Sequence, residues 1–239
     1  MWEAEASLTM DPIKHTDCVD SVRFSPDGML LATGGNENDM AIKIWNPIAG
    51  THIHTLCGHS SSISSLAFSD DKSMLASGDD DGTVHVWDVS SGRLLLTLSH
   101  DATYGNIRQL QFTEDNLNLI LRTYKTTYTW DITLTTSGEE LEEATGVQLL
   151  SKKSEGNRSD SNDLEDVSQG YFFKVKSYHK IFMGKSGQKN ASIVGAVPDE
   201  YSINKFAFHT NCNHLALGCV DGSVLIVDIS RLKLRLEPC

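Results

Sequence analysis

A repeat with a fixed step constrains this chain more than any other feature of its sequence. Phe24, Phe68 and Phe112 lie 44 residues apart, and each ends an apolar-x-Phe pair within a similar stretch. Self-similarity at a period of 20 to 50 residues indicates stacked supersecondary units, each of which buries its apolar face only against a neighbour. The sequence therefore predicts an array of similar units.

The first two copies of the repeat agree in detail. They read "HTDCVDSVRFSPDGMLLATGGNENDMAIKIWN" from His15 and "HSSSISSLAFSDDKSMLASGDDDGTVHVWD" from His59. Both place a histidine first, then an apolar-x-Phe pair, a Leu-Ala-Thr/Ser-Gly run and a tryptophan, and they differ by a two-residue insertion. Two further copies are eroded. One begins at His100, and the last, "INKFAFHTNCNHLALGCVDGSVLIVD", has Val227 at the tryptophan position.

Each unit reads as four short strands. Turn compositions "SDDK", "GDDDG" and "VSSG" separate the β-rich runs of the second copy. The predicted strands are Ile63 to Phe68, Ser73 to Ser77, Thr83 to Trp87 and Arg93 to Leu98. Short strands with regular turns indicate an all-β protein.

The predicted organisation is a single region, 1–239, made of repeated units. The stretch 151–170 is polar, charged and free of aromatic residues, so it is predicted to be a disordered insertion. The five predicted units are 15–58, 59–99, 100–150 (eroded), 171–201 (irregular) and 202–239 (eroded).

The second copy resembles the WD40 repeat. It carries "GH" at Gly58-His59, an Asp-Gly turn at Asp81-Gly82 and "WD" at Trp87-Asp88. The resemblance implies an all-β WD40 β-propeller, partial or short, with about four to five blades of four antiparallel strands. It also implies a hydrogen-bonded tetrad in each well-preserved blade. The tetrads are His15, Thr33, Asp39 and Trp45 in the first copy, and His59, Ser77, Asp81 and Trp87 in the second.

A His, Ser and Asp set also suggests a catalytic triad. A nucleophile and its base are needed once per site, whereas this set returns at the repeat period with a tryptophan attached. We therefore expect a structural role for the tetrads, no catalytic residue and no enzymatic activity. The enzymatic alternative is a propeller with a metal or an acid–base group in its central channel.

A narrower resemblance concerns the last third of the chain, which is similar to the carboxyl end of fungal NACHT-WD40 receptors of the heterokaryon-incompatibility type. The residues that carry it are Ile181-Phe182, Pro198 to Tyr201, Leu215 to Gly218 and Gly222 to Ser230. The chain lacks the phosphate-binding loop of a NACHT module, so no NTPase activity is implied. An alternative is that the chain is a fragment of such a receptor without independent activity.

The number of units raises the question of ring closure. Closed propellers of this family usually have about seven blades, more than this chain supplies. A short ring with irregular closure, a fragment, and self-association through unclosed blade edges are the three alternatives.

Charge and composition restrict the classes of partner that the chain can bind. The net charge of −12 argues against nucleic acid and anionic membranes, which both need a basic surface. The N-terminus lacks the pattern of a signal peptide, so a cytoplasmic location is expected, with the nucleus as an alternative. "GKS" at 184–186 lacks the first glycine of a phosphate-binding loop, and the cysteines and histidines show no metal-site spacing. No cofactor and no metal are expected.

The leading functional hypothesis is a scaffold that presents propeller loops to partner proteins or peptides. Family analogy places the binding face at the loops between blades and between second and third strands. Their acidity predicts basic partners. The candidate residues are Asn36, Glu37, Asp39, Ser60, Ser62, Asp79, Asp80, Asp101, Tyr104 and Asn106, with Tyr104 the residue type most typical of a binding hot spot.

Overall fold

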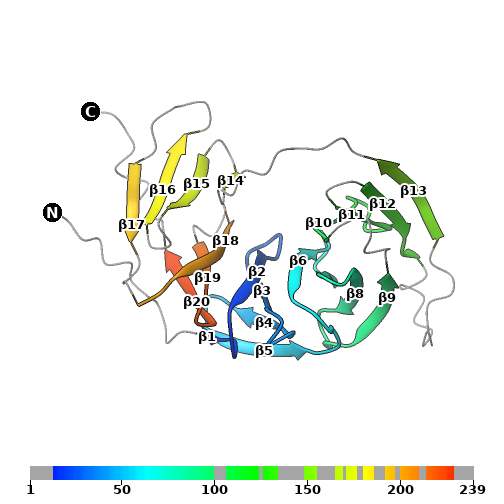
Figure 1. Cartoon of the computed structure of the whole chain (residues 1–239), viewed down its shortest axis with the longest axis horizontal. Helices are drawn as coiled ribbons and strands as arrows, with labels where there is room; N and C mark the ends of the chain where they lie inside the picture. The colour runs from blue at the N-terminus through cyan, green and yellow to red at the C-terminus, as the bar shows by residue number, and fades with distance from the viewer. Residues whose placement is uncertain are drawn as a thin grey trace.

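The computed structural model describes residues 13–99, 106–123, 126–133, 148–154, 165–168, 171–176, 180–185, 192–196, 200–209 and 214–228. These residues form five four-stranded antiparallel sheets, which we call blades 1 to 5 (Figure 1). The predicted all-β class with four-stranded blades is confirmed.

The first three blades follow the chain from the first tetrad onward. Blade 1 contains β2 (Val19–Phe24), β3 (Leu31–Gly35), β4 (Ile42–Asn46) and β5 (Thr51–Leu56). Blade 2 contains β6 (Ile63–Phe68), β7 (Met74–Asp79), β8 (Thr83–Asp88) and β9 (Leu94–Ser99). Blade 3 contains β10 (Gln109–Phe112), β11 (Asn118–Arg122), β12 (Thr126–Asp131) and β13 (Gln148–Ser154).

The last two blades complete the strand inventory. Blade 4 contains β14 (Glu165–Ser168), β15 (Tyr171–Lys176), β16 (Lys180–Lys185) and β17 (Ser192–Ala196). Blade 5 contains β18 (Ile203–His209), β19 (His214–Cys219), β20 (Ser223–Asp228) and, from the other end of the chain, β1 (Ile13–Lys14).

The prediction of a disordered insertion at 151–170 was wrong for two segments. Residues 151–154 belong to β13 and residues 165–168 form β14, while 155–164 lie outside the described residues. Both segments pair antiparallel with an adjacent strand, for example Ser154 with Thr126. An outer strand is held through its backbone, so a polar composition does not prevent pairing.

The fourth strand of blade 5 was also missed. The predicted unit 202–239 takes all its strands from the last part of the chain, whereas the fourth strand is β1, from the first part. β1 pairs antiparallel with β20, and the His15 amide donates to the Gly222 carbonyl at 2.8 Å. Gly222 has φ +83, and a Cβ there would lie 2.6 Å from the His15 carbonyl oxygen. Only glycine suits both the conformation and the close approach. Two residues carry too little periodicity to be recognised as a strand.

The blades are arranged in an arc, in the order 4, 5, 1, 2 and 3 (Figure 1). Their innermost strands lie side by side, with β2 between β18 and β6, and β10 against β6; β14 contacts β18. Among the described residues, blades 3 and 4 share no comparable packed pair of strands, and Figure 1 shows them at opposite ends of the arc. The described residues form a partial propeller.

The core consists of apolar seams between adjacent blades rather than one central cluster. Blade 1 packs on blade 5 through Val19, Phe24 and Trp45, with Ala216 and Ile226 opposite. Similar clusters join blade 1 to blade 2 and blade 2 to blade 3. In blades 1, 2, 3 and 5, the apolar residues of these clusters are therefore buried against neighbouring blades, as the repeat predicts.

Candidate functional site

The tetrad of blade 1 joins four side chains, from just after β1, from β3, from the turn between β3 and β4 and from β4. His15 Nδ1 bonds Asp39 Oδ2, and His15 Nε2 lies 2.6 Å from Thr33 Oγ1. Trp45 Nε1 donates to the same hydroxyl at 2.8 Å. His15 follows β1, Thr33 is on β3 and Trp45 is on β4, so the tetrad ties the end of blade 5 to two strands of blade 1.

The hydrogen bonds of this tetrad favour one tautomer of His15. A tryptophan nitrogen only donates, so the Thr33 hydroxyl accepts from Trp45, and its own hydrogen has two acceptors in reach, His15 Nε2 and the Lys43 carbonyl at 3.5 Å. His15 is the closer of the two, and a neutral imidazole that accepts at Nε2 and donates from Nδ1 to Asp39 satisfies both contacts. Burial lowers the pKa of His15 below its ordinary value of 6.5, against the opposing effect of Asp39, and so favours this neutral form.

The tetrad of blade 2 contains a different aspartate from the predicted one. His59 Nε2 lies 2.7 Å from Ser77 Oγ, and Trp87 Nε1 donates to that hydroxyl at 2.8 Å. The partner of His59 Nδ1 is Asp79 Oδ2, at 2.9 Å. The prediction of Asp81 was wrong: Asp81 is exposed, whereas Asp79 is fully buried.

The two blades place an equivalent carboxylate from different chain positions. Asp79 is the last residue of β7, and the same register position in β3 is Gly35. A Cβ on Gly35 would lie 2.6 Å from the Asp39 Cβ, so the side chain of Asp39 occupies the space that a strand aspartate would use. Blade 1 therefore needs a glycine at this position because its carboxylate comes from the longer turn.

Asp79 is ionised in the folded blade. Burial would raise its pKa, but hydrogen bonds from His59 and from the Thr83 amide, at 2.8 Å, outweigh burial and lower the pKa below 3.8. The carboxylate thus ties the histidine to the first residue of β8. This network holds the turn between β7 and β8 in place.

Blade 3 keeps the tryptophan and loses the rest of this network. In register, Leu121 stands where blade 2 has Ser77, and Thr123 stands where it has Asp79. Leu121 is fully buried, Trp130 stacks on Tyr128 at 5.8 Å between ring centroids, and the Thr123 hydroxyl bonds the turn at Thr126. The eroded sequence replaces polar bonds with apolar packing. His100, the histidine of this copy, lies outside the described residues.

Comparison with known proteins agrees with this geometry. The family model "WD domain, G-beta repeat" matches residues 8–46 and 50–88, which carry the two tetrads. These two segments of the chain are WD40 repeats.

The relatives of this chain are diverse proteins. The chain is 34% identical over 119 residues to small ribosomal subunit protein RACK1y of Oryza sativa, and the aligned region covers 49% of this chain and 34% of that protein. It is 32% identical to the COMPASS component SWD3 (46% and 36% covered) and 30% identical to the target of rapamycin complex subunit LST8 (44% and 35% covered), both of Saccharomyces cerevisiae. The chain thus spans about a third of the length of these relatives. None of these three is a NACHT-WD40 receptor.

The predicted binding loops gather at one end of the WD40 blades, which we call the loop face. Glu37, Ser60 and Asn106 are exposed there, whereas Asp101 and Tyr104 lie outside the described residues. Three more candidates are partly buried: Asn36, Ser62 and Asp80. Asp39 and Asp79 were both predicted to belong to the binding loops, and Asp39 was also predicted to belong to a tetrad. Because their carboxylates bind the tetrad histidines, they position the loops and are not free for a partner.

Acidic side chains from neighbouring blades meet on the loop face. The pKa of Asp80 is raised, first by burial and then by the carboxylates of Asp20, Asp79 and Asp81, with Lys205 acting in the opposite direction. Asn204 of blade 5 donates to the carboxylate of Asp20 in blade 1 at 2.8 Å and so ties this carboxylate to blade 5. Asp20 was missed by the sequence reasoning. It is a partly buried residue at the irregularity of β2 between Val19 and Ser21.

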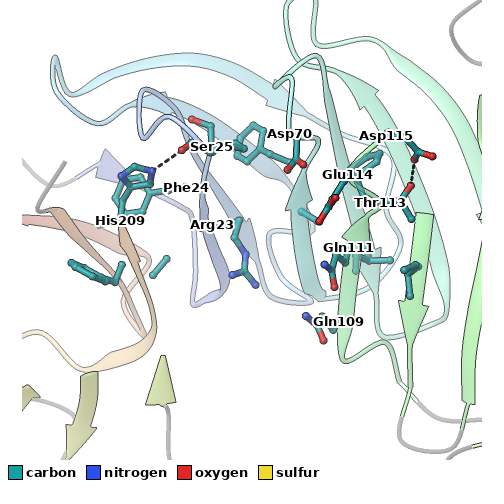
Figure 2. Close-up of a pocket in the computed structure, with 18 residues that line it drawn as sticks. Arg23, Phe24, Ser25, Asp70, Gln109, Gln111, Thr113, Glu114, Asp115 and His209 are labelled. Carbon is teal, nitrogen blue, oxygen red and sulfur yellow. Dashed lines mark hydrogen bonds between the residues drawn. The ribbon is translucent and has the colours of Figure 1, made fainter. Parts of the chain in front are cut away.

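A groove lies at the other end of the innermost strands and was not predicted. It is formed by the ends of β2, β6, β10 and β18 and by the turns that follow the first three of these strands (Figure 2). Arg23, Gln109 and Gln111 are exposed along it, and the carboxylates of Asp70 and Glu114 lie toward the turns. Arg23 Nε donates to the Leu66 carbonyl at 3.3 Å, which connects blades 1 and 2. Alternate polar residues on innermost strands were the available sequence signal.

Other kinds of site find no support in the part of the chain that the structure describes. Its histidines, cysteines and acids nowhere form a group of three that could hold a metal ion. The same residues include no helix with the length and apolarity needed to cross a membrane.

Proposed function

We propose that this chain is a non-catalytic protein-interaction module whose loop face binds basic peptide segments of partner proteins. WD40 proteins are typically scaffolds that bind other proteins, and the family assignment supports this class of function. The observation that carries the choice of partner is the group of carboxylates at Asp20, Asp80 and Asp81, whose effect on Asp80 is opposed by Lys205.

The electrostatics of this group favour a positively charged partner. The raised pKa of Asp80 means that its ionised form is disfavoured by burial and by neighbouring like charges. A lysine or arginine from a partner would relieve that repulsion on binding. Attraction between exposed charges also speeds association and weakens with ionic strength.

The tetrads supply the rigidity that such a surface needs. Asp79 is anchored by His59 and the Thr83 amide, and Asp80 follows it directly, with its amide bonded to the Ser62 carbonyl at 3.1 Å. Loops held in one conformation lose little entropy on binding, which favours affinity.

The names of the relatives point in the same direction. They are described as a COMPASS component, a subunit of a target of rapamycin complex and a small ribosomal subunit protein, so each is part of an assembly. By similarity we propose that this chain also acts within an assembly. Membership of a NACHT-WD40 receptor and a cytoplasmic or nuclear location are narrower proposals that rest on the sequence resemblance and composition alone.

The test is peptide binding to the full chain, measured by fluorescence anisotropy with lysine- and arginine-rich peptides against glutamate-rich peptides of equal length. Asp80→Asn and Asp20→Asn should each weaken basic-peptide binding about fivefold at low salt, a typical effect of one exposed charge pair. Asp115→Asn, at the opposite end of the blades, is the matched control. Equal affinity for acidic peptides, or binding unaffected by salt and by both loop-face variants, would refute the proposal.

A further inference from the structure

Adjacent blades fit together through a repeated contact between a glycine and a branched side chain. At three seams, a Cβ added to the glycine would lie 2.5 to 2.8 Å from the apolar residue of the next blade, so no other residue fits. The pairs are Gly218 with Val19, Gly34 with Ile63 and Gly78 with Ile107. The three glycines hold the same position in the second strand of their blades.

Blade 3 breaks this pattern at the equivalent position. Arg122 pairs with Thr127 in the same register in which Gly78 pairs with Val84. Arg122 is exposed, and its Nη1 donates to Gln109 Oε1 at 3.1 Å, across the innermost and second strands. A guanidinium and its amide partner thus occupy the place where a fourth seam would need an empty surface.

The other residues on this face of blade 3 are also less buried than the matching residues of blades 1, 2 and 5. In blades 1, 2 and 5 the matching positions of the second and third strands are small or aliphatic and buried: Ala32, Ile42 and Ile44; Ala76, Val84 and Val86; Ala216, Val224 and Ile226. In blade 3 they are Ile120, Thr127 and Thr129, none of which is fully buried.

This face is also continuous with the groove. Gln109, Gln111 and Ile120 belong to the outer face of blade 3 and line the groove of Figure 2 as well. Neither innermost-strand glutamine is covered, whereas the matching residues of β6, Ser65 and Ala67, are buried by blade 3. The surface that other blades use for stacking is here part of the solvent-accessible groove.

We propose that the outer face of blade 3, made of Gln109, Gln111, Ile120, Arg122, Thr127 and Thr129, is a finished end of the blade stack. Terminal units of stacked repeats need a polar outer face, and these residues provide one. Neither another blade of this chain nor a second copy stacks there in the manner of the other seams. The groove is therefore open along the end face as well as along the innermost strands.

The test compares thiol labelling at this face and at a true seam in the folded full chain. Arg122→Cys should react with a maleimide at least about 100-fold faster than Ala76→Cys, because the second site opens only by unfolding or separation of blades 2 and 3. Site-resolved mass spectrometry separates these thiols from the native cysteines. Equally slow labelling of both sites, or labelling of Arg122→Cys that slows as protein concentration rises, would overturn the proposal.

A second variant covers the case in which Ala76→Cys does not fold. Arg122→Ala removes the guanidinium without adding bulk, and the melting temperature should shift by no more than about 2 °C, as for an exposed residue. A loss of cooperative unfolding in this variant would show that Arg122 supports a packed interface, and the end-face assignment would be wrong.

Discussion

Blades 2 and 3 have the same strand order and equivalent registers, yet different interactions hold them. In blade 2, His59, Ser77, Asp79 and Trp87 form one buried hydrogen-bonded set. In blade 3, Leu121 and the stacked Tyr128 and Trp130 fill the corresponding space. The four-stranded unit is thus compatible with either a polar or an apolar centre, because its alternating buried residues already determine the pairing.

The difference matters for what each blade can tolerate. Replacing a whole buried polar network by apolar residues is often neutral, whereas removing one member leaves the other members unsatisfied. Blade 2 should therefore be sensitive to single substitutions in its tetrad. Blade 3 has one stacked face and one exposed face, so it should open at lower free energy than blade 2.

The largest effect is expected from giving blade 2 the residue that ends the stack in blade 3. Gly78→Arg places a Cβ 2.8 Å from Ile107 and drives a charge into the seam between blades 2 and 3. The free energy of unfolding should fall by about 3 kcal/mol or more, measured by urea denaturation. A change below about 1 kcal/mol would mean that this seam is not tightly packed.

The tetrad assignment is tested by a pair of neighbouring aspartates. Asp79→Ala leaves His59 Nδ1 and the Thr83 amide without an acceptor and should cost about 3 kcal/mol. Asp81→Ala, at an exposed turn, should change stability by less than about 0.5 kcal/mol. The reverse order in thermal or urea unfolding would restore Asp81 as the tetrad carboxylate.

Acid should weaken the tetrad blades in two steps. His15 has a lowered pKa in the fold, so below pH 6.5 the unfolded chain gains a proton that the folded blade resists, and stability falls as pH decreases. Asp79 also has a lowered pKa, so the stability that it contributes above pH 3.8 is lost as pH falls through the folded value. Urea unfolding between pH 7 and 3 measures both steps. His15→Gln should be less stable and show a shallower slope near pH 6, and the remaining slope comes from His85, whose pKa burial also lowers. An unchanged slope would contradict the role of His15.

The smallest effect concerns contacts between the outer turns of adjacent blades. Lys72 Nζ lies 2.7 Å from Asp27 Oδ2. Burial would raise the pKa of Asp27, but hydrogen bonds from Lys72 and other donors outweigh it and lower the pKa to about 2. The matching contact between blades 2 and 3 is uncharged, from the Asp70 amide to Asn116 Oδ1 at 2.9 Å. Lys72→Ala should cost under about 1 kcal/mol and Asn116→Ala a similar amount. Only the first loss should disappear at about 1 M salt; the same salt response in both would contradict the account.

Sequence reasoning succeeded where side chains themselves carry the pattern. The period of the phenylalanines located the repeated units, and the turn compositions of the second copy gave the four strands of blade 2 to within two residues. It failed over Asp79 and Asp81 because Asp79 ends β7 and Asp81 lies two residues later in the turn, and only backbone register decides which one reaches His59. β1 was missed because its pairing with β20 depends on the two ends of the chain meeting.

The surface was harder to foresee than the core. Asp20 and Asp80 come together only because blades 1 and 2 stack with β2 beside β6, a contact that no local pattern encodes. The groove likewise depends on four innermost strands that are far apart in sequence. Arg122 did carry a usable signal, since it stands where three other copies have glycine in aligned second strands.

The central claim, that tetrad-held blades are followed by a less protected end blade, is tested most directly by native-state hydrogen exchange of the wild-type chain. We expect the slowest amide exchange in β7 and β8 around Ser77 and Trp87, and exchange at least about tenfold faster in β11 and β12 around Leu121 and Trp130. Equal protection of the two blades, or greater protection of blade 3, would contradict the account.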